Sequence, residues 1–117
     1  EEGPFGAGGG DDLKQILWDM VRTETLKESE KLAGAVQSKL EMELHMPSRG
    51  VKQAPFYVLM GSSIPAILVE IGFMTTSEEA AKLASPAVQE KIADALFSAL
   101  LHYDTFMATQ AGGAPRP

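Results

Sequence analysis

The sequence predicts an α/β fold, in which a mixed central sheet is flanked by helices and this chain supplies about two strands and three or four helices. Two observations predict it. Long segments carry apolar residues at the spacing of one helical face, and two short β-branched or aromatic runs lie between them, bounded by turn residues. Because two strands alone form a marginal sheet, we expect part of the sheet to lie outside this chain.

The first predicted helix begins near Leu13, capped by Asp11 or Asp12. Its apolar positions share one face and are Leu13, Ile16, Leu17, Met20 and Val21, followed by Leu32, Ala33, Val36, Leu40 and Leu44. The pattern weakens at residues 23–25, which leaves two alternatives. Either one long helix bends there, or Thr25 caps a second helix with Glu28 completing a capping box. Residues 47–50, Pro-Ser-Arg-Gly, are expected to end the helix.

Two strands are expected next, at residues 56–59 and 66–69, with a turn at 61–63. The second run is almost wholly apolar, which is typical of a strand buried on both faces. The connection is too short for a helical crossover, so neighbouring strands would pair antiparallel.

Two more helices follow. Thr76 and Glu79 have the spacing of a capping box that opens a short helix ending near Leu83. Ser85 and Pro86 then begin a helix of about 22 residues, since proline is favoured at the first helical position. Its apolar stripe (Val88, Ile92, Leu96, Ala99, Leu100, Tyr103) is interpreted as core rather than as a cofactor site.

Composition narrows the function. The 117 residues carry 10 Lys and Arg against 16 Asp and Glu, a net charge of −6, so neither nucleic acid nor an anionic membrane is an expected partner. The chain has no cysteine, which excludes disulfides and thiol chemistry. No apolar run approaches the roughly 20 residues that cross a bilayer, and no signal peptide begins at Glu1.

Glu70 is the residue most suited to chemistry. It follows the apolar run directly and precedes Ile71 and Gly72, at the carboxyl end of a strand, where α/β folds place their sites. Burial there would favour the protonated carboxyl and make Glu70 a usable acid or base. The alternative is a structural glutamate that points to solvent or pairs with a lysine.

The two histidines, His45 and His102, show no metal-binding spacing. His45 is expected at a helix end, where a cation suits the helix dipole, and His102 lies off the apolar stripe. The residues alone therefore predict an acidic α/β chain with one candidate glutamate, and they name no reaction.

Residues 49–59 and 64–73, the latter including Pro-Ala-Ile-Leu-Val-Glu-Ile-Gly-Phe, resemble the C-terminal half of a zinc-dependent N-acetylmuramoyl-L-alanine amidase. Residues 77–80, 29–33 and 91–95 fit the same pattern. Residues 1–10, five of them glycine, and residues 110–117 are expected from their composition to be a flexible lead-in and a flexible tail. The resemblance makes residues 11–109 the C-terminal part of the catalytic domain.

The resemblance implies hydrolysis of peptidoglycan at the amide between N-acetylmuramic acid and the L-alanine of the stem peptide, with Glu70 as a catalytic residue. It implies a zinc ion whose ligands, two histidines and a glutamate, lie outside this chain, so the chain alone would be inactive. It also implies a periplasmic or extracellular location and, for the whole enzyme, regulation by an envelope activator protein. Arg49 and Lys52 match the family pattern, and structural pairing is the expected role for both.

The sequence departs from the family at residues 74–77, Met-Thr-Thr-Ser, where relatives usually carry Ser-Asn-Pro. Thr76 can cap a helix as Asn does, so the change is expected to be tolerated. Two other functions stay open. One is a non-enzymatic α/β interaction or dimerisation module that pairs with itself or with the missing N-terminal half, and the other is a helical binding module in which Glu70 is only structural.

Overall fold

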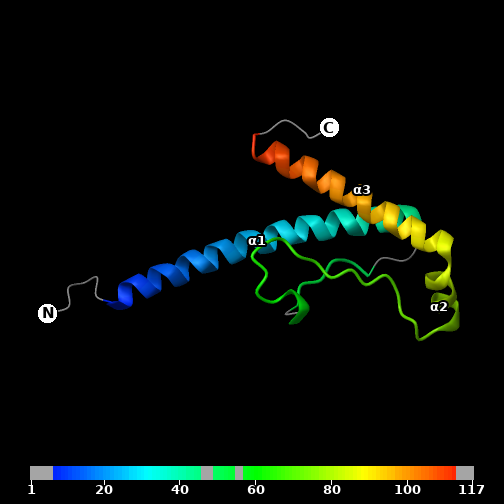
Figure 1. Cartoon of the computed structure of the whole chain (residues 1–117), viewed down its shortest axis with the longest axis horizontal. Coiled ribbons are helices and arrows are strands. Elements are labelled where there is room, and N and C mark those ends of the chain that lie inside the picture. The colour runs from blue at the N-terminus through cyan, green and yellow to red at the C-terminus, as the bar shows by residue number, and fades with distance from the viewer. Residues whose placement is uncertain (1–6, 46–48, 55–56, 113–117) are drawn as a thin grey trace.

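Three helices dominate the structure, a computed structural model that describes residues 7–45, 49–54 and 57–112. They are α1, Ala7–Leu44; α2, Ser77–Ala84; and α3, Pro86–Gln110. The helix α3 lies across the C-terminal half of α1, and α2 turns the chain into α3 (Figure 1). Two extended segments, 49–54 and 64–73, connect α1 to α2, separated by a single 3-10 turn at Tyr57–Leu59.

The predicted central sheet is wrong for the described residues, because none of them belongs to a β-strand. Tyr57–Leu59 forms a 3-10 turn where a strand was expected, and Phe56 lies outside the described residues. Residues 66–69, the second predicted strand, are not a β-strand either, because a strand requires a partner that shares its backbone hydrogen bonds. Without the first strand, the described part of the chain offers no such partner.

The intervening turn lies where the sequence predicts it. The amide of Ser62 donates to the carbonyl of Leu59 at 3.4 Å, and the Ser62 hydroxyl donates to the carbonyl of Ile64 at 2.7 Å. Gly61 has a φ of 81°, a conformation in which a Cβ atom would be strained.

The helix α1 is continuous through residues 23–25, which decides between the two alternatives left by the sequence. It also begins at Ala7, so residues 7–10 of the predicted lead-in are helical, while residues 1–6 lie outside the described part. The helix ends at Leu44, before the predicted stop. His45 adopts a left-handed φ of 52° while its amide donates to the carbonyl of Glu41, and residues 46–48 are not described.

The two C-terminal helices begin where the sequence predicts. Thr76 is the N-cap of α2, and its hydroxyl accepts a hydrogen bond from the amide of Glu79 at 3.3 Å. Pro86 opens α3, which runs 25 residues to Gln110 and therefore into the first residue of the predicted tail. No helix among the described residues is long and apolar enough to cross a bilayer.

The core is small and lies where α1 and α3 cross. Leu32 and Val36 from α1 meet Ala99 from α3, and Ile67 and Val69 of the extended segment pack against the same cluster. Small residues at the contact, such as the fully buried Ala99, let the two helices approach closely. Burial beside this seam, and secondarily the charge of Glu28, raise the pKa of Tyr103.

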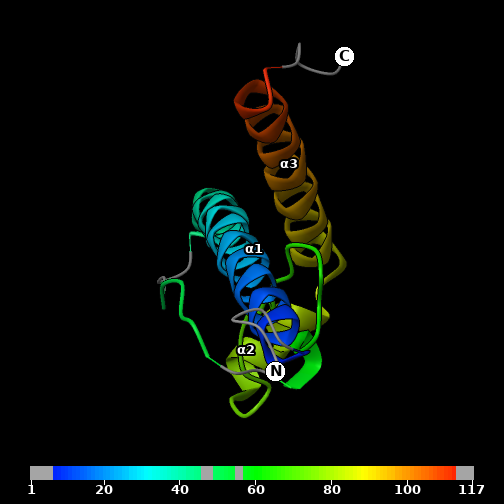
Figure 2. The ribbon, with the colours of Figure 1, turned by 90° about the vertical axis from the view of Figure 1, so that its left-hand side faces the viewer.

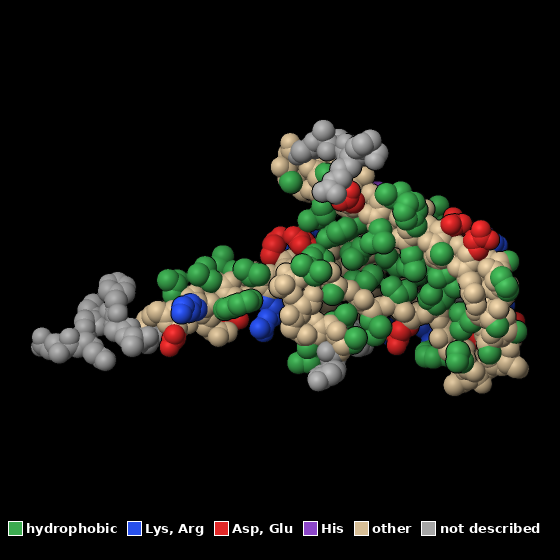
Figure 3. All heavy atoms as spheres, viewed as in Figure 1, with side chains coloured by type: hydrophobic (Ala, Val, Ile, Leu, Met, Phe, Trp, Pro, Cys, Tyr) green, Lys and Arg blue, Asp and Glu red, His purple; other side chains and the backbone are tan. Residues whose placement is uncertain are grey.

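Much apolar surface stays uncovered. The radius of gyration is 19.7 Å, well above the roughly 13 Å of a compact domain of about 100 residues. Every described side chain in residues 9–24 is exposed, because this half of α1 projects alone from the rest of the chain (Figures 1 and 2). Apolar side chains are visible along this projection and over the region where α1, α3 and the extended segment meet (Figure 3).

Enlarging Ala99 tests the helix crossing. We expect Ala99→Leu to lower the free energy of unfolding by about 1–3 kcal/mol, because the added atoms overpack the seam. The matched control is Ala93→Leu, which adds the same atoms on an exposed position of α3 and should change stability by less than about 0.5 kcal/mol. Urea midpoints of the two variants provide the measurement, and equal midpoints would contradict the crossing.

Candidate active site

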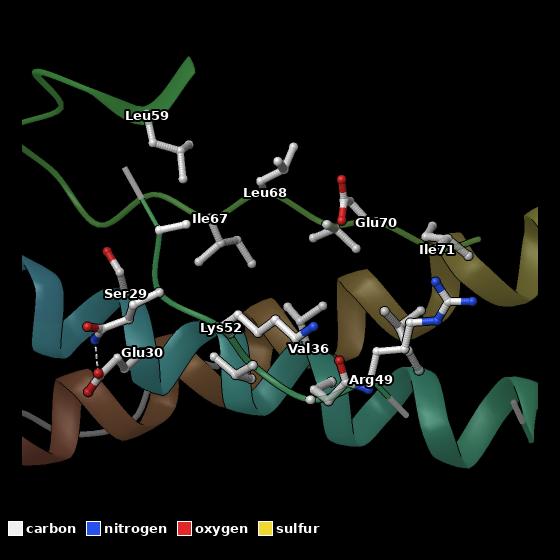
Figure 4. A pocket seen from close by; sticks show the side chains of 18 of the residues that line it. Ser29, Glu30, Val36, Arg49, Lys52, Leu59, Ile67, Leu68, Glu70 and Ile71 are labelled. Atoms are coloured by element: carbon white, nitrogen blue, oxygen red, sulfur yellow. Dashed lines mark hydrogen bonds between the residues drawn. The ribbon is translucent and has the colours of Figure 1, made fainter. Parts of the chain in front are cut away.

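A groove of about 410 Å³ runs between α1 and the two extended segments. Its floor is the middle of α1, including Ser29 and Val36, and its walls are residues 49–54 and 66–73. Glu70, Arg49 and Lys52 all line it, so the structure brings the candidate carboxylate and both family-pattern cations to one place (Figure 4).

Segment 66–73 alternates its side chains as a strand does. Ile67 points toward α1, whereas Leu68 and Glu70 point to the opposite side (Figure 4). Val69, between them, packs on the core cluster. Burial of Ile67 and Val69 therefore sets the direction of Glu70.

Glu70 is exposed, and this differs from the burial expected at the end of an apolar strand. The difference follows from the absence of a sheet, since no neighbouring strand covers the outer face of the segment. Within the described residues the Glu70 carboxylate has no hydrogen bond or ion pair. It is an open carboxylate at the wall of a groove, able to accept or donate a proton.

The segment that carries Glu70 is anchored at both ends. Upstream, the amide of Ala66 donates to the Ser29 hydroxyl at 3.0 Å, while that hydroxyl donates to the carbonyl of Thr25 at 2.9 Å. Downstream, the amide of Phe73 donates to the Glu79 carboxylate at 3.1 Å. Between these anchors, residues 67–72 make no hydrogen bond within the described part of the chain.

Sequence reasoning missed Ser29 and the reach of Glu79. The signals available for Ser29 were its place in mid-helix, one turn before the buried Leu32, and the fit of residues 29–33 to the family pattern. Glu79 was assigned to the capping box, where its carboxylate would return to the N-cap amide. Its carboxylate instead bonds the amide of Phe73, three residues before the cap.

Arg49 pairs with an aromatic ring. Its guanidinium lies 4.2 Å from the centroid of the Phe73 ring, a cation–π contact beside the downstream anchor. Lys52 lines the same groove, and Gln53 next to it donates a hydrogen bond to the Glu30 carboxylate of α1, which ties segment 49–54 to that helix. The structural pairing predicted for Arg49 is therefore made with Phe73.

The histidines do not join this site. His45 follows the end of α1, and His102 lines a separate groove of about 480 Å³ between α1 and α3, where Lys31 lies 5.2 Å from the centroid of Phe106. In the described part of the chain, no three His, Cys, Asp or Glu side chains come together as metal ligands. The residues present here thus do not fit a zinc ion.

Comparison with known proteins places this sequence in a family. Residues 14–102 match the family model described as N-acetylmuramoyl-L-alanine amidase. The amidase AmiA of Salmonella typhimurium is 38% identical over 91 residues, covering 78% of this chain and 32% of that protein. AmiA of Escherichia coli is 37% identical over 91 residues, which again cover 78% of this chain and 32% of that protein.

A relative from a third organism is also named as this amidase. The amidase LytC of Bacillus subtilis is 39% identical over 75 residues, 64% of this chain and 15% of that protein. No match to a solved structure was found. The chain spans about a third of the length of the two AmiA proteins. Since the family model covers most of the chain and includes the anchored Glu70 segment, this protein belongs to the N-acetylmuramoyl-L-alanine amidase family.

Proposed function

We propose that the chain is part of an enzyme that hydrolyses peptidoglycan at the amide between N-acetylmuramic acid and the L-alanine of the stem peptide. The observation that carries this proposal is the family match over residues 14–102, together with relatives that are themselves named as this amidase. Peptidoglycan is therefore the proposed substrate, and the cell envelope, periplasmic or extracellular, the proposed location.

In this proposal Glu70 is the catalytic carboxylate contributed by the chain. Amide hydrolysis requires a group that takes a proton from the attacking water and delivers one to the leaving amine. Glu70 suits both steps, because its carboxylate is exposed at the groove and has no partner within the described residues. Its backbone is held from both sides by Ser29 and Glu79, which limits the positions that the carboxylate can take.

Replacing Glu70 in the full-length enzyme tests this role. We expect Glu70→Gln to lower kcat for stem-peptide release by about 10²–10⁴-fold, because the amide cannot accept the proton. The free energy of unfolding should change by less than about 0.5 kcal/mol, since the side chain is exposed.

The control is Glu78→Gln, which removes an equally exposed carboxylate on α2 whose partner is Lys82 at 3.8 Å. Activity should stay near that of the unchanged enzyme. Retention of full activity by Glu70→Gln would refute a catalytic role and favour the structural alternative.

We also propose that the enzyme depends on zinc bound by residues outside this sequence, as the resemblance of residues 49–59 and 64–73 to zinc-dependent amidases implies. When bound, the ion would polarise the scissile carbonyl and activate water. The 117-residue chain by itself should then retain well under one zinc per chain after dialysis and should release no stem peptide from purified peptidoglycan. Elemental analysis and a chromatographic release assay measure both. One tightly held zinc per chain, or release of peptide, would overturn this part of the proposal.

The uncovered apolar surface points to a further proposed partner, the remaining part of the same amidase domain. Leu13, Ile16 and Leu17 on the projecting half of α1 are each more than half exposed, and such contiguous apolar surface is usually buried in an interface. A chain deprived of that cover would bury the surface against a second copy of itself.

We therefore expect the isolated chain to self-associate as its concentration rises, as measured by sedimentation equilibrium. Ile16→Glu, which puts a charge on the apolar stripe, should shift the association to higher concentration. Gln15→Glu adds the same charge on the polar side and should leave it nearly unchanged. A strictly monomeric chain over a hundredfold concentration range would contradict the interpretation.

A further inference from the structure

Glu79 makes an unexpected use of its carboxylate. Thr76 and Glu79 occupy the two positions of a capping box, and the threonine half is formed, because its hydroxyl accepts from the amide of Glu79. The glutamate half of the capping box is not formed. The Glu79 carboxylate accepts instead from the amide of Phe73, at 3.1 Å, outside the helix.

This bond fixes the point at which the Glu70 segment leaves the groove. Phe73 is three residues beyond Glu70, roughly 10 Å of extended chain. The amides and carbonyls of the intervening residues make no hydrogen bond within the described part of the chain, so beyond the packed Val69 the first hydrogen bond to the backbone of the segment is the one at Phe73. A charged acceptor makes this bond stronger than a neutral one would.

Two other contacts meet at the same place. The Arg49 guanidinium covers the Phe73 ring at 4.2 Å from its centroid, and Leu83 of α2 lies against Gly72, 3.5 Å from where a Cβ atom would stand. Glu79 and Leu83 of α2 and the side chain of Arg49 thus all contact the exit of the segment, at Gly72 and Phe73. Among the described residues, the only hydrogen bond made by the Phe73 backbone is the one that its amide donates to the Glu79 carboxylate.

We propose that Glu79 is a positioning residue for Glu70: its carboxylate holds the Phe73 amide and thereby sets where the Glu70 carboxylate stands in the groove. The inference rests on the proposed function of Glu70 and assigns Glu79 no contact with substrate. Misplacing a reacting group by about 1 Å can cost on the order of 100-fold in rate, so the anchor has a measurable kinetic effect.

Two substitutions of Glu79 separate positioning from a simple charge effect at the start of α2. Glu79→Asp keeps the negative charge that suits the helix N-terminus but withdraws the carboxylate by one methylene, so it no longer reaches Phe73. Glu79→Gln loses the charge but keeps an oxygen at the right reach.

In the full-length enzyme we expect Glu79→Asp to lower kcat by about ten- to 100-fold with KM within about twofold. Glu79→Gln should stay within about threefold of the unchanged enzyme, since its amide oxygen replaces the acceptor. A helix-stabilising role alone gives the opposite order, with Asp better than Gln.

The neighbouring Glu78→Ala serves as the matched control, because Glu78 also lies in the first turn of α2 but, among the described residues, forms an ion pair only with Lys82. It should leave kcat unchanged. Hydrogen exchange gives a readout independent of catalysis: the Phe73 amide should exchange faster in Glu79→Asp than in Glu79→Gln or Glu78→Ala.

If Glu79→Asp keeps full kcat while Glu70→Gln abolishes activity, the positioning role is refuted and the proposed function stands. If Glu79→Gln proves worse than Glu79→Asp in both kcat and Phe73 exchange, the carboxylate acts through its charge and the inference is overturned. If Glu70→Gln is fully active, the proposed function fails first, and the positioning role fails with it.

Discussion

The packing of Ile67 and Val69 into the seam between α1 and α3 is the contact on which the rest of the site depends. An extended chain turns successive side chains to opposite sides, so burying these two residues directs Leu68 and Glu70 outward. The same contact places the segment along α1, where the Ser29 hydroxyl can accept a hydrogen bond from the amide of Ala66. The apolar packing of Ile67 and Val69 thereby places the Glu70 carboxylate on the wall of the groove.

Backbone hydrogen bonding and apolar burial differ between the helices and the extended segment. Its helices supply their own backbone hydrogen bonds, and the crossing of α1 with α3 buries Leu32, Val36, Ala95 and Ala99. The extended segment differs, because its middle amides and carbonyls have no partner in the described chain and its outer face is open. Together with the bare N-terminal half of α1, this surface agrees with a chain that covers about a third of the AmiA relatives it matches.

The start of α2 carries both a helix cap and a hydrogen bond to the chain outside the helix. Thr76 alone caps the helix with its hydroxyl, and this leaves the Glu79 carboxylate available for the backbone outside the helix. Arg49 closes the same corner through the Phe73 ring, so a residue from before the 3-10 turn and residues from α2 meet at one point. Segments far apart in the sequence thus converge on Gly72 and Phe73, shortly after Glu70.

Local signals in the sequence determined α2 and α3 and their starts, because Thr76 as a cap and Pro86 at the first turn of α3 each act within a few residues. For α1 the apolar spacing predicted the helix but not its start, which lies at Ala7 rather than near Leu13, so neither Asp11 nor Asp12 is its cap. The motif around Glu70 also identified the family, which residues 14–102 confirm. The sheet could not be determined in this way. An apolar run predicts only that its side chains pack away from water, whereas a strand also needs a second strand to share its backbone hydrogen bonds. Only the tertiary structure decided that Ile67 and Val69 are partly buried against helices, that Glu70 is exposed, and that Ser29 and Glu79 hold its segment, since those contacts join residues whose spacing carries no common pattern.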